Sequence, residues 1–160
     1  MPNMKVFMKI EGIDGSSRDA DHANWCDLRG FSHEMSYPFD MREGEGRGEP
    51  QHGRCTGFKQ IDKATPLLYE KLAKKKQVPS VLFEFWRDNP DGGGSECYFK
   101  IELKDCRVVY AKPYMPRGLE MDETTPPHME EIGFAYRVIN WTWLSGGQIP
   151  TTFDFSNPNA

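Results

Sequence analysis

Short runs of aromatic and β-branched residues, bounded by turn residues and prolines, constrain the fold of this chain most. Such runs favour strands because side chains branched at Cβ fit a pleated, half-buried surface. Two of them flank the glycine-rich stretch "NPDGGG", which predicts a β-hairpin. Helical patterns do not alternate with the runs, so a parallel sheet is not expected. The runs are Met4–Ile10, Val81–Trp86, Cys97–Leu103, Cys106–Ala111, Ile132–Trp143 and Thr151–Phe155.

One helix is expected within the stretch "ATPLLYEKLAKKK", residues 64–76. Thr65 is the expected N-cap and Pro66 the first helical residue, where the missing N–H of proline removes no hydrogen bond. Leu68 and Leu72 are four residues apart, which places both on the face that contacts the sheet. The basic run Lys74–Lys76 follows at the C-terminus, where cations interact favourably with the helix dipole.

These elements predict a mainly β protein: a small antiparallel β-barrel with one α-helix that caps one end. The chain has 160 residues, so residues 1–160 are expected to form a single domain whose core needs no disulfide bonds. The run Ile132–Trp143 is expected to be one strand whose far end is apolar on both faces. One face would pack in the core and the other against a partner. Residues 156–160 are expected to be a C-terminal tail.

The charge of the chain argues against nucleic acid as a partner. The formal net charge is −4, whereas binding a phosphate backbone needs a basic face. No stretch approaches the ~20 apolar residues of a membrane span, and the N-terminus lacks the apolar region of a signal peptide. The four cysteines include no CxxC pair and are expected to be reduced thiols of a protein made in the cytoplasm.

An acidic stretch, "KIEGIDGSSRDADHANW", holds the residues most suggestive of chemistry. Asp14, Asp19, Asp21 and His22 lie close together, and carboxylates beside a histidine can bind a metal or form an acid–base pair. Asp-Gly and short polar residues also form turns, and the spacing does not match an EF-hand loop. We therefore expect a structural turn, with no catalytic residue, metal site or cofactor.

The other histidines show no catalytic pattern. His33 and Glu34 are adjacent in an expected strand and would point to opposite faces, while His52 lies in a glycine-rich loop and His128 follows two prolines. The sequence has no GxSxG motif, and "EGEGRGEP" lacks the GK[ST] ending of a phosphate-binding loop. The sequence therefore predicts no enzymatic activity.

The stretch Asp40–Arg54 is expected to be a mobile loop between strands. Its one apolar residue, Met41, cannot bury enough surface to offset the entropy of ordering the backbone, and its glycines raise that entropy. Its charges have both signs, which would suit contact with a like surface on a neighbouring copy. The charged residues are Arg42, Glu43, Glu45, Arg47 and Glu49.

Three stretches resemble the hemolysin-coregulated protein (Hcp) family of bacterial type VI secretion. They are "KIEGIDGSSRDADHANW" at Lys9–Trp25, "FKQIDKATPLLYEKLAKKK" at Phe58–Lys76, and "YFKIELKDCRVV" at Tyr98–Val109. The "DKATP" that opens the helix is the most specific of these signatures. The order of strands, helix and hairpin also matches, and the resemblance covers about Met4–Phe155.

This resemblance implies a β-barrel with one helix that forms homohexameric rings. The rings would stack into the inner tube of a contractile injection apparatus, in contact with sheath, baseplate and spike proteins, and effector proteins would be held in the ring lumen. The protein would be in the bacterial cytoplasm before firing and then be secreted without a signal peptide. The resemblance also implies that the loop containing Arg42, Glu43, Glu45, Arg47 and Glu49 reaches toward the next ring.

Two other function classes are open on the sequence. An independent carbohydrate- or peptide-binding β-domain could use Trp86, Trp141 and Trp143 as an aromatic platform. A metal-dependent hydrolase could use Asp19, Asp21 and His22, and it would need stoichiometric metal. The tube subunit is the preferred interpretation because it accounts for strands that are apolar on both faces and for the missing catalytic groups.

Overall fold

The computed structural model describes residues 4–46, 48–116 and 128–159. In these ranges the chain forms one 8-stranded antiparallel sheet, two separate 2-stranded pairs and one helix, α1 (Thr65–Ala73). The strands are β1 (Lys5–Ile10), β2 (Cys26–Ser32), β3 (Met35–Ser36), β4 (Phe39–Asp40), β5 (Glu45–Gly46), β6 (Gln51–His52), β7 (Cys55–Gln60), β8 (Gln77–Asp88), β9 (Ser95–Tyr114), β10 (Met129–Ala135), β11 (Val138–Trp143) and β12 (Ile149–Asp154).

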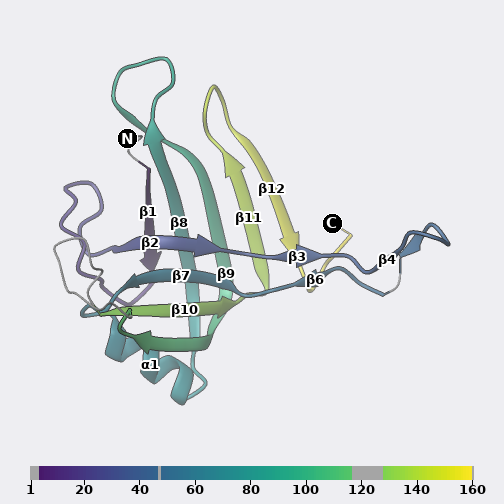
Figure 1. The fold of residues 1–160 in the computed structure, drawn as a ribbon, viewed down its shortest axis with the longest axis horizontal. Coiled ribbons are helices and arrows are strands. Elements are labelled where there is room, and N and C mark those ends of the chain that lie inside the picture. The colour runs from purple at the N-terminus through teal and green to yellow at the C-terminus, as the bar shows by residue number, and fades with distance from the viewer. Residues whose placement is uncertain (1–3, 47, 117–127, 160) are drawn as a thin grey trace.

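The sheet closes on itself into a barrel. Its strand order is β10-β7-β2-β1-β8-β9, and β9 pairs again with β10, so hydrogen bonding returns to its starting strand. In Figure 1, β2, β7 and β10 run across β1 and β8, so the barrel has two walls that cross each other. The hairpin β11–β12 extends the sheet from the first half of β9. The predicted mainly β barrel with one helix is confirmed for the described residues.

One long strand, β9, turns the corner between the two walls. The sequence predicted separate strands at Cys97–Leu103 and Cys106–Ala111, and this is wrong because β9 is continuous from Ser95 to Tyr114. Its residues before Asp105 pair with β11, and those after it pair with β10. Asp105 itself has a φ of 53°, which aspartate tolerates better than most residues and which bends the strand.

The predicted single strand Ile132–Trp143 is two strands. β10 ends at Ala135 and β11 begins at Val138, and the two pair with opposite ends of β9. The Arg137 side chain holds this break beside the bend of β9, because its Nε donates to Asp105 Oδ2 over 2.7 Å. Val138 and Ile139 are both buried because the chain changes sheet walls here, so the predicted run does not form one strand that is apolar on both faces.

The core fills the barrel and extends under α1. Its members are side chains that point inward from both walls together with the buried face of the helix, and all have little or no exposed surface. The largest fully buried apolar side chains are Met8, Leu68, Phe83, Leu103, Ile132, Phe134 and Ile139. Cys26, Cys55 and Cys106 are buried free thiols and Cys97 is partly buried, as the expectation of reduced cysteines required.

Helix α1 begins one residue earlier than the sequence indicated. Thr65 is the first helical residue instead of the N-cap, and it closes a turn with Asp62. The Asp62 carboxylate accepts from the backbone N–H of Ala64 over 3.0 Å, and the Thr65 hydroxyl oxygen accepts from the N–H of Asp62 over 3.0 Å. This reciprocal pair satisfies two backbone donors ahead of the helix, as a capping box does. The "DKATP" stretch thus fixes the start of α1.

Beneath α1 lies a buried ion pair between Lys59 of β7 and Glu130 of β10. Lys59 is 1% exposed and Glu130 is fully buried. The Lys59 ammonium also bonds Asp62 over 2.7 Å. Thr65 and Tyr69 on the helix each donate a hydroxyl to Glu130 over 2.7 Å. Charges removed from water need such complete pairing, so this network joins α1 to two strands of the barrel.

The buried face of α1 gives a direct test of how the helix contacts the barrel. Leu68 is fully buried and Leu67 is 45% exposed, although the two are neighbours. Leu68→Ala should lower the free energy of unfolding by ~2–5 kcal/mol because it leaves a cavity, whereas Leu67→Ala should change it little. Chemical denaturation of both variants measures the difference. Equal and small effects would show that α1 does not pack on the barrel as described.

Candidate functional site

A long β-hairpin, formed by residues 33–54 and called the arm below, projects from one end of the barrel (Figure 1). The strand pairs β3–β6 and β4–β5 join its two sides. The stretch Asp40–Arg54, which was expected to be a mobile loop between strands, includes the end of β4, β5 and β6. Whether the arm is mobile in solution stays a prediction.

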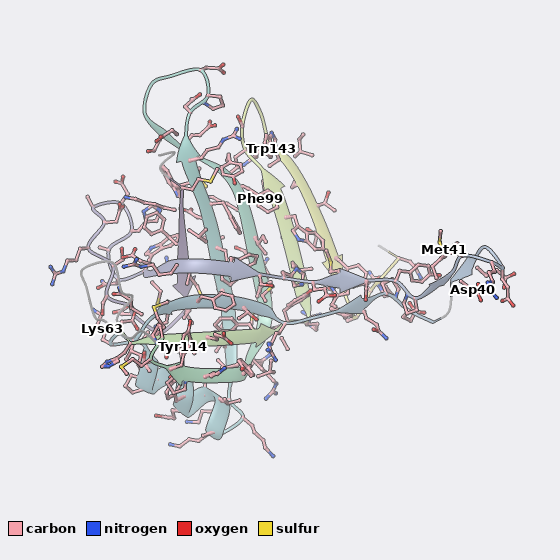
Figure 2. All side chains as sticks on the ribbon, viewed as in Figure 1. Asp40, Met41, Lys63, Phe99, Tyr114 and Trp143 are labelled. Carbon is pink, nitrogen blue, oxygen red and sulfur yellow. The ribbon has the colours of Figure 1, made fainter. Side chains whose placement is uncertain are left out.

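One side of the arm carries exposed apolar side chains at every second residue. Met35, Tyr37 and Phe39 are each about half exposed, and Met41 is 87% exposed. Residues two apart along an extended chain point to the same side, so Met35, Tyr37 and Phe39 share one side of the arm. Met41 follows them in the tip turn, and these four side chains are together called the apolar face below. Figure 2 shows Met41 near the far end of the arm, well away from the barrel. The single subunit therefore leaves about half or more of each of these side chains exposed.

The tip of the arm is a tight turn built around Asp40. The Asp40 carboxylate accepts from the backbone N–H of Arg42 over 2.9 Å and of Glu43 over 3.2 Å. Gly44 has a φ of 66°, a conformation that glycine adopts without strain, and its N–H donates to the carbonyl oxygen of Asp40 over 2.8 Å. The turn therefore has a defined shape despite its polar and glycine-rich composition.

The charged residues singled out from the sequence lie on the outer part of the arm. Arg42 and Glu43 are in the tip turn, Glu45 is in β5, and Glu49 follows β5; all four are exposed. Arg47 lies outside the described residues. Charges of both signs thus adjoin the apolar face. The sequence had not indicated that face, because Met35, Tyr37 and Phe39 precede the stretch that was considered.

At the base of the arm, three distant parts of the chain meet around the hydroxyl of Tyr136. His33 Nε2 lies 2.8 Å from this hydroxyl and His52 Nδ1 lies 2.7 Å from it. The His52 ring also contacts Phe153 of β12 and Phe155, which follows it, at centroid distances of 5.1 and 4.7 Å. His33 and His52, together with the Tyr136 hydroxyl between them, are called the histidine pair below. Sequence reasoning missed it because its members are up to 103 residues apart.

The acidic stretch between β1 and β2 is a turn tied to the barrel through His22. His22 is only 4% exposed, and its ring stacks on Phe7 at 3.9 Å. Its Nδ1 lies 2.8 Å from Asp19, and its Nε2 lies 2.8 Å from Glu84 of β8. The stretch is a turn as predicted, but Asp19 and His22 are joined to β8, and Asp14 and Asp21 are not part of this contact.

Both ring nitrogens of His22 face carboxylates, which favours the imidazolium because only that form donates from both. Burial opposes the charged ring, but the hydrogen bonds to Asp19 and Glu84 outweigh it and raise the pKa of His22. The bond from His22 in turn lowers the pKa of Asp19. Burial of Glu84 acts the other way, yet its bonds to His22 and Trp86 lower the pKa of that carboxyl as well.

This arrangement does not resemble a metal site. Among the described residues, no group of three or more histidine, cysteine, aspartate or glutamate side chains is placed to hold a metal ion. Asp19 and Glu84 occupy the two nitrogens of His22, and Lys100 lies 3.3 Å from the other oxygen of Glu84. The contacts of His22 are those of a buried structural ion pair.

The three tryptophans proposed as an aromatic platform have different surroundings. Trp86 contacts the His22 ring and donates its N–H to Glu84 over 3.1 Å. Trp141 packs against the core. Trp143, near the outer end of β11 in Figure 2, contacts Tyr98 and donates its N–H to the carbonyl oxygen of Ser145. The three rings therefore do not share one exposed surface.

The pairing of His22 predicts a dependence of stability on pH. A raised pKa in the folded protein means that the pair stabilises fully below the ordinary value of 6.5 and that this stabilisation is lost as pH rises through the raised value. Wild type should therefore lose more unfolding free energy than His22→Gln between about pH 6 and about pH 9. Denaturant titrations at both pH values measure this, with His128→Gln as the control. Equal losses in wild type and His22→Gln would contradict the assignment.

Comparison with known proteins identifies the family. A family model described as "Type VI secretion system effector, Hcp" matches residues 7–143. The chain is 30% identical over 128 residues to the "Major exported protein" of Pseudomonas aeruginosa, covering 80% of this chain and 74% of that protein.

Solved structures share the fold. Hcp1 from Salmonella typhimurium matches with a TM-score of 0.77 at 20% identity, covering 98% of this chain and 97% of that one. Secreted protein Hcp3 from Pseudomonas aeruginosa matches with a TM-score of 0.73 at 23% identity, covering 96% and 99%. None of the helices in the described residues has the length and hydropathy to cross a membrane. Since the family model matches most of the sequence, this chain belongs to the Hcp family of type VI secretion.

Proposed function

We propose that this chain is the ring-forming subunit of the type VI inner tube. On this proposal residues 1–160 act as one structural unit without catalytic activity, and six copies form a ring. The observation that carries the proposal is the apolar face of the arm, which is exposed on the single subunit and lies far from the barrel. Family membership supplies the context in which that face would be covered.

An exposed row of large apolar side chains favours contact with another protein surface. Met35, Tyr37 and Phe39 lie along one side of a hairpin held by few strand pairs, with Met41 in its tip turn, so packing on a second copy would stabilise it. A closed ring covers the same surface on every subunit. The arm of one copy would thus contact the next copy, and both would lose exposed apolar area.

The outer part of the arm is suited to contact between rings. Arg42, Glu43, Glu45 and Glu49 supply both signs of charge near the tip, and Arg47 adds to them in the sequence. Such a surface can complement charges on an adjacent ring and set its rotational position. We place the inter-ring contact of the tube here, with the arm becoming fully ordered on stacking.

The remaining parts of the proposal follow from a tube that is expelled. The stacked rings would contact sheath, baseplate and spike proteins, and effector proteins would travel in the lumen. The protein would be assembled in the bacterial cytoplasm and leave it without a signal peptide. The relative named "Major exported protein" supports export of this chain.

Replacing Glu43–Glu49 by a Gly-Ser linker tests the role of the arm. The barrel and its core do not involve these residues, so rings should keep the mass of wild-type rings in light scattering. Tube formation, measured by sedimentation of concentrated protein, and export by producing cells should both fall, because the charged tip that contacts the next ring is lost.

A second variant separates the apolar face from the charges. Serine at Met35, Tyr37, Phe39 and Met41 should weaken assembly more than Leu67→Ser, which changes a leucine on α1 about as exposed as Met35, Tyr37 and Phe39. Wild-type assembly and export in both arm variants would show that the arm makes no contact between copies.

A further inference from the structure

The histidine pair at the base of the arm connects the arm to the barrel, so the protonation state of the two imidazoles bears on the direction in which the arm projects. His33 leads from β2 into the arm and His52 leaves it toward β7, so the two imidazoles hold both sides of the hairpin. Their common partner, the Tyr136 hydroxyl, belongs to the corner between β10 and β11. Through these two histidines, both sides of the arm contact the Tyr136 hydroxyl on the barrel.

Hydrogen bonding at the Tyr136 hydroxyl is complete only when the imidazoles are neutral. A hydroxyl can donate to one neutral imidazole while it accepts from the N–H of the other. When both rings are protonated, each nitrogen that faces the hydroxyl carries a proton, and the hydroxyl proton loses its acceptor. Two positive rings would then lie with centroids 6.4 Å apart in a half-buried site, and they would repel each other.

The surroundings offer little to stabilise two added charges. On the arm side the nearest charged groups in sequence are Glu34 and Arg54, both exposed, and Arg54 lies over the Tyr110 ring at 3.8 Å. At the β10–β11 corner Arg137 is paired with Asp105 and with Asp154 of β12. From β12 and the residues after it, the rings that cover His52 are Phe153 and Phe155. Within the described residues, neither His33 nor His52 forms an ion pair with a carboxylate, in contrast to His22.

We propose that His33, His52 and Tyr136 form an acid-sensitive latch that holds the arm to the barrel at neutral pH and releases it when both imidazoles are protonated. Release means loss of the two hydrogen bonds to Tyr136 and separation of His52 from Phe153 and Phe155. The strands of the barrel are unchanged, because the latch contacts the barrel only at its corner and at β12.

The direction of the effect follows from proton binding. Burial lowers the pKa of both histidines below the ordinary value of 6.5. The charge of His52 lowers the pKa of His33 further, and together these effects outweigh a backbone hydrogen bond with Gly53 that raises it. The latched form therefore binds fewer protons than the released form, so the latch is stable above pH 6.5 and weakens as pH falls below it. His22 responds in the opposite sense, since acid keeps it charged and paired.

A consequence for assembly rests on the proposed function. If the arm contacts the next copy, acid would detach its base and loosen that contact, whereas neutral conditions would keep arms aligned for stacking. The latch itself is a property of the subunit, so it can be tested whether or not rings stack.

Hydrogen–deuterium exchange on the full-length protein tests the latch, with rates corrected for the intrinsic effect of pH. Between about pH 7.5 and about pH 5, exchange at residues 33–36 and 51–54 should become roughly tenfold faster or more in wild type. The double variant His33→Gln/His52→Gln should show no such change, because an amide can bond the hydroxyl without titrating. Each single variant should show a smaller change than wild type.

His128→Gln is the matched control, since His128 is exposed and lies at the opposite end of β10 from Tyr136. It should behave as wild type does, and β1 and β8 should stay protected in every protein at both pH values. Equal acceleration at the arm base in wild type and in the double variant would overturn the proposal. So would acid-induced exchange that spreads equally over β1 and β8, because that would be unfolding of the barrel.

Discussion

The buried pair of Lys59 and Glu130 is the contact on which the rest of the structure depends. Neither charge has access to water, so each needs the other and the hydrogen bonds around them. Removing one partner of such a pair typically costs ~3–5 kcal/mol. The pair links β7 to β10, which closes the barrel with β9, and Glu130 also receives the two hydroxyls of α1.

Local patterns in the sequence predicted the elements of the barrel but not its corners. The hairpin around "NPDGGG", the first strand and the helix depend on neighbouring residues and were predicted, although α1 begins one residue earlier than expected and ends at Ala73. The bend of β9 at Asp105 and the break before Val138 depend on which distant strand each half pairs with. Periodicity in one segment carries no information about its partner, so two strands were predicted where one exists and one where two exist.

In the candidate site, too, local sequence predicted some features, whereas contacts between distant residues were not predicted. The charges of the arm were identified from composition, but their arrangement along a hairpin was not, since few apolar residues mark those strands. Met35, Tyr37 and Phe39 of the apolar face precede the stretch Asp40–Arg54 that the sequence analysis considered. The histidine pair and the contact of His22 with Glu84 join residues at least 62 apart, and only the folded barrel brings them together.

On the proposed function, copies of this chain close into rings through surfaces that the single subunit leaves exposed. Electron microscopy of the purified full-length protein in negative stain tests it most directly. We expect class averages of rings with six-fold symmetry, at neutral pH and over a wide range of protein concentration. Particles of single-subunit size throughout that range, with the barrel folded, would contradict it.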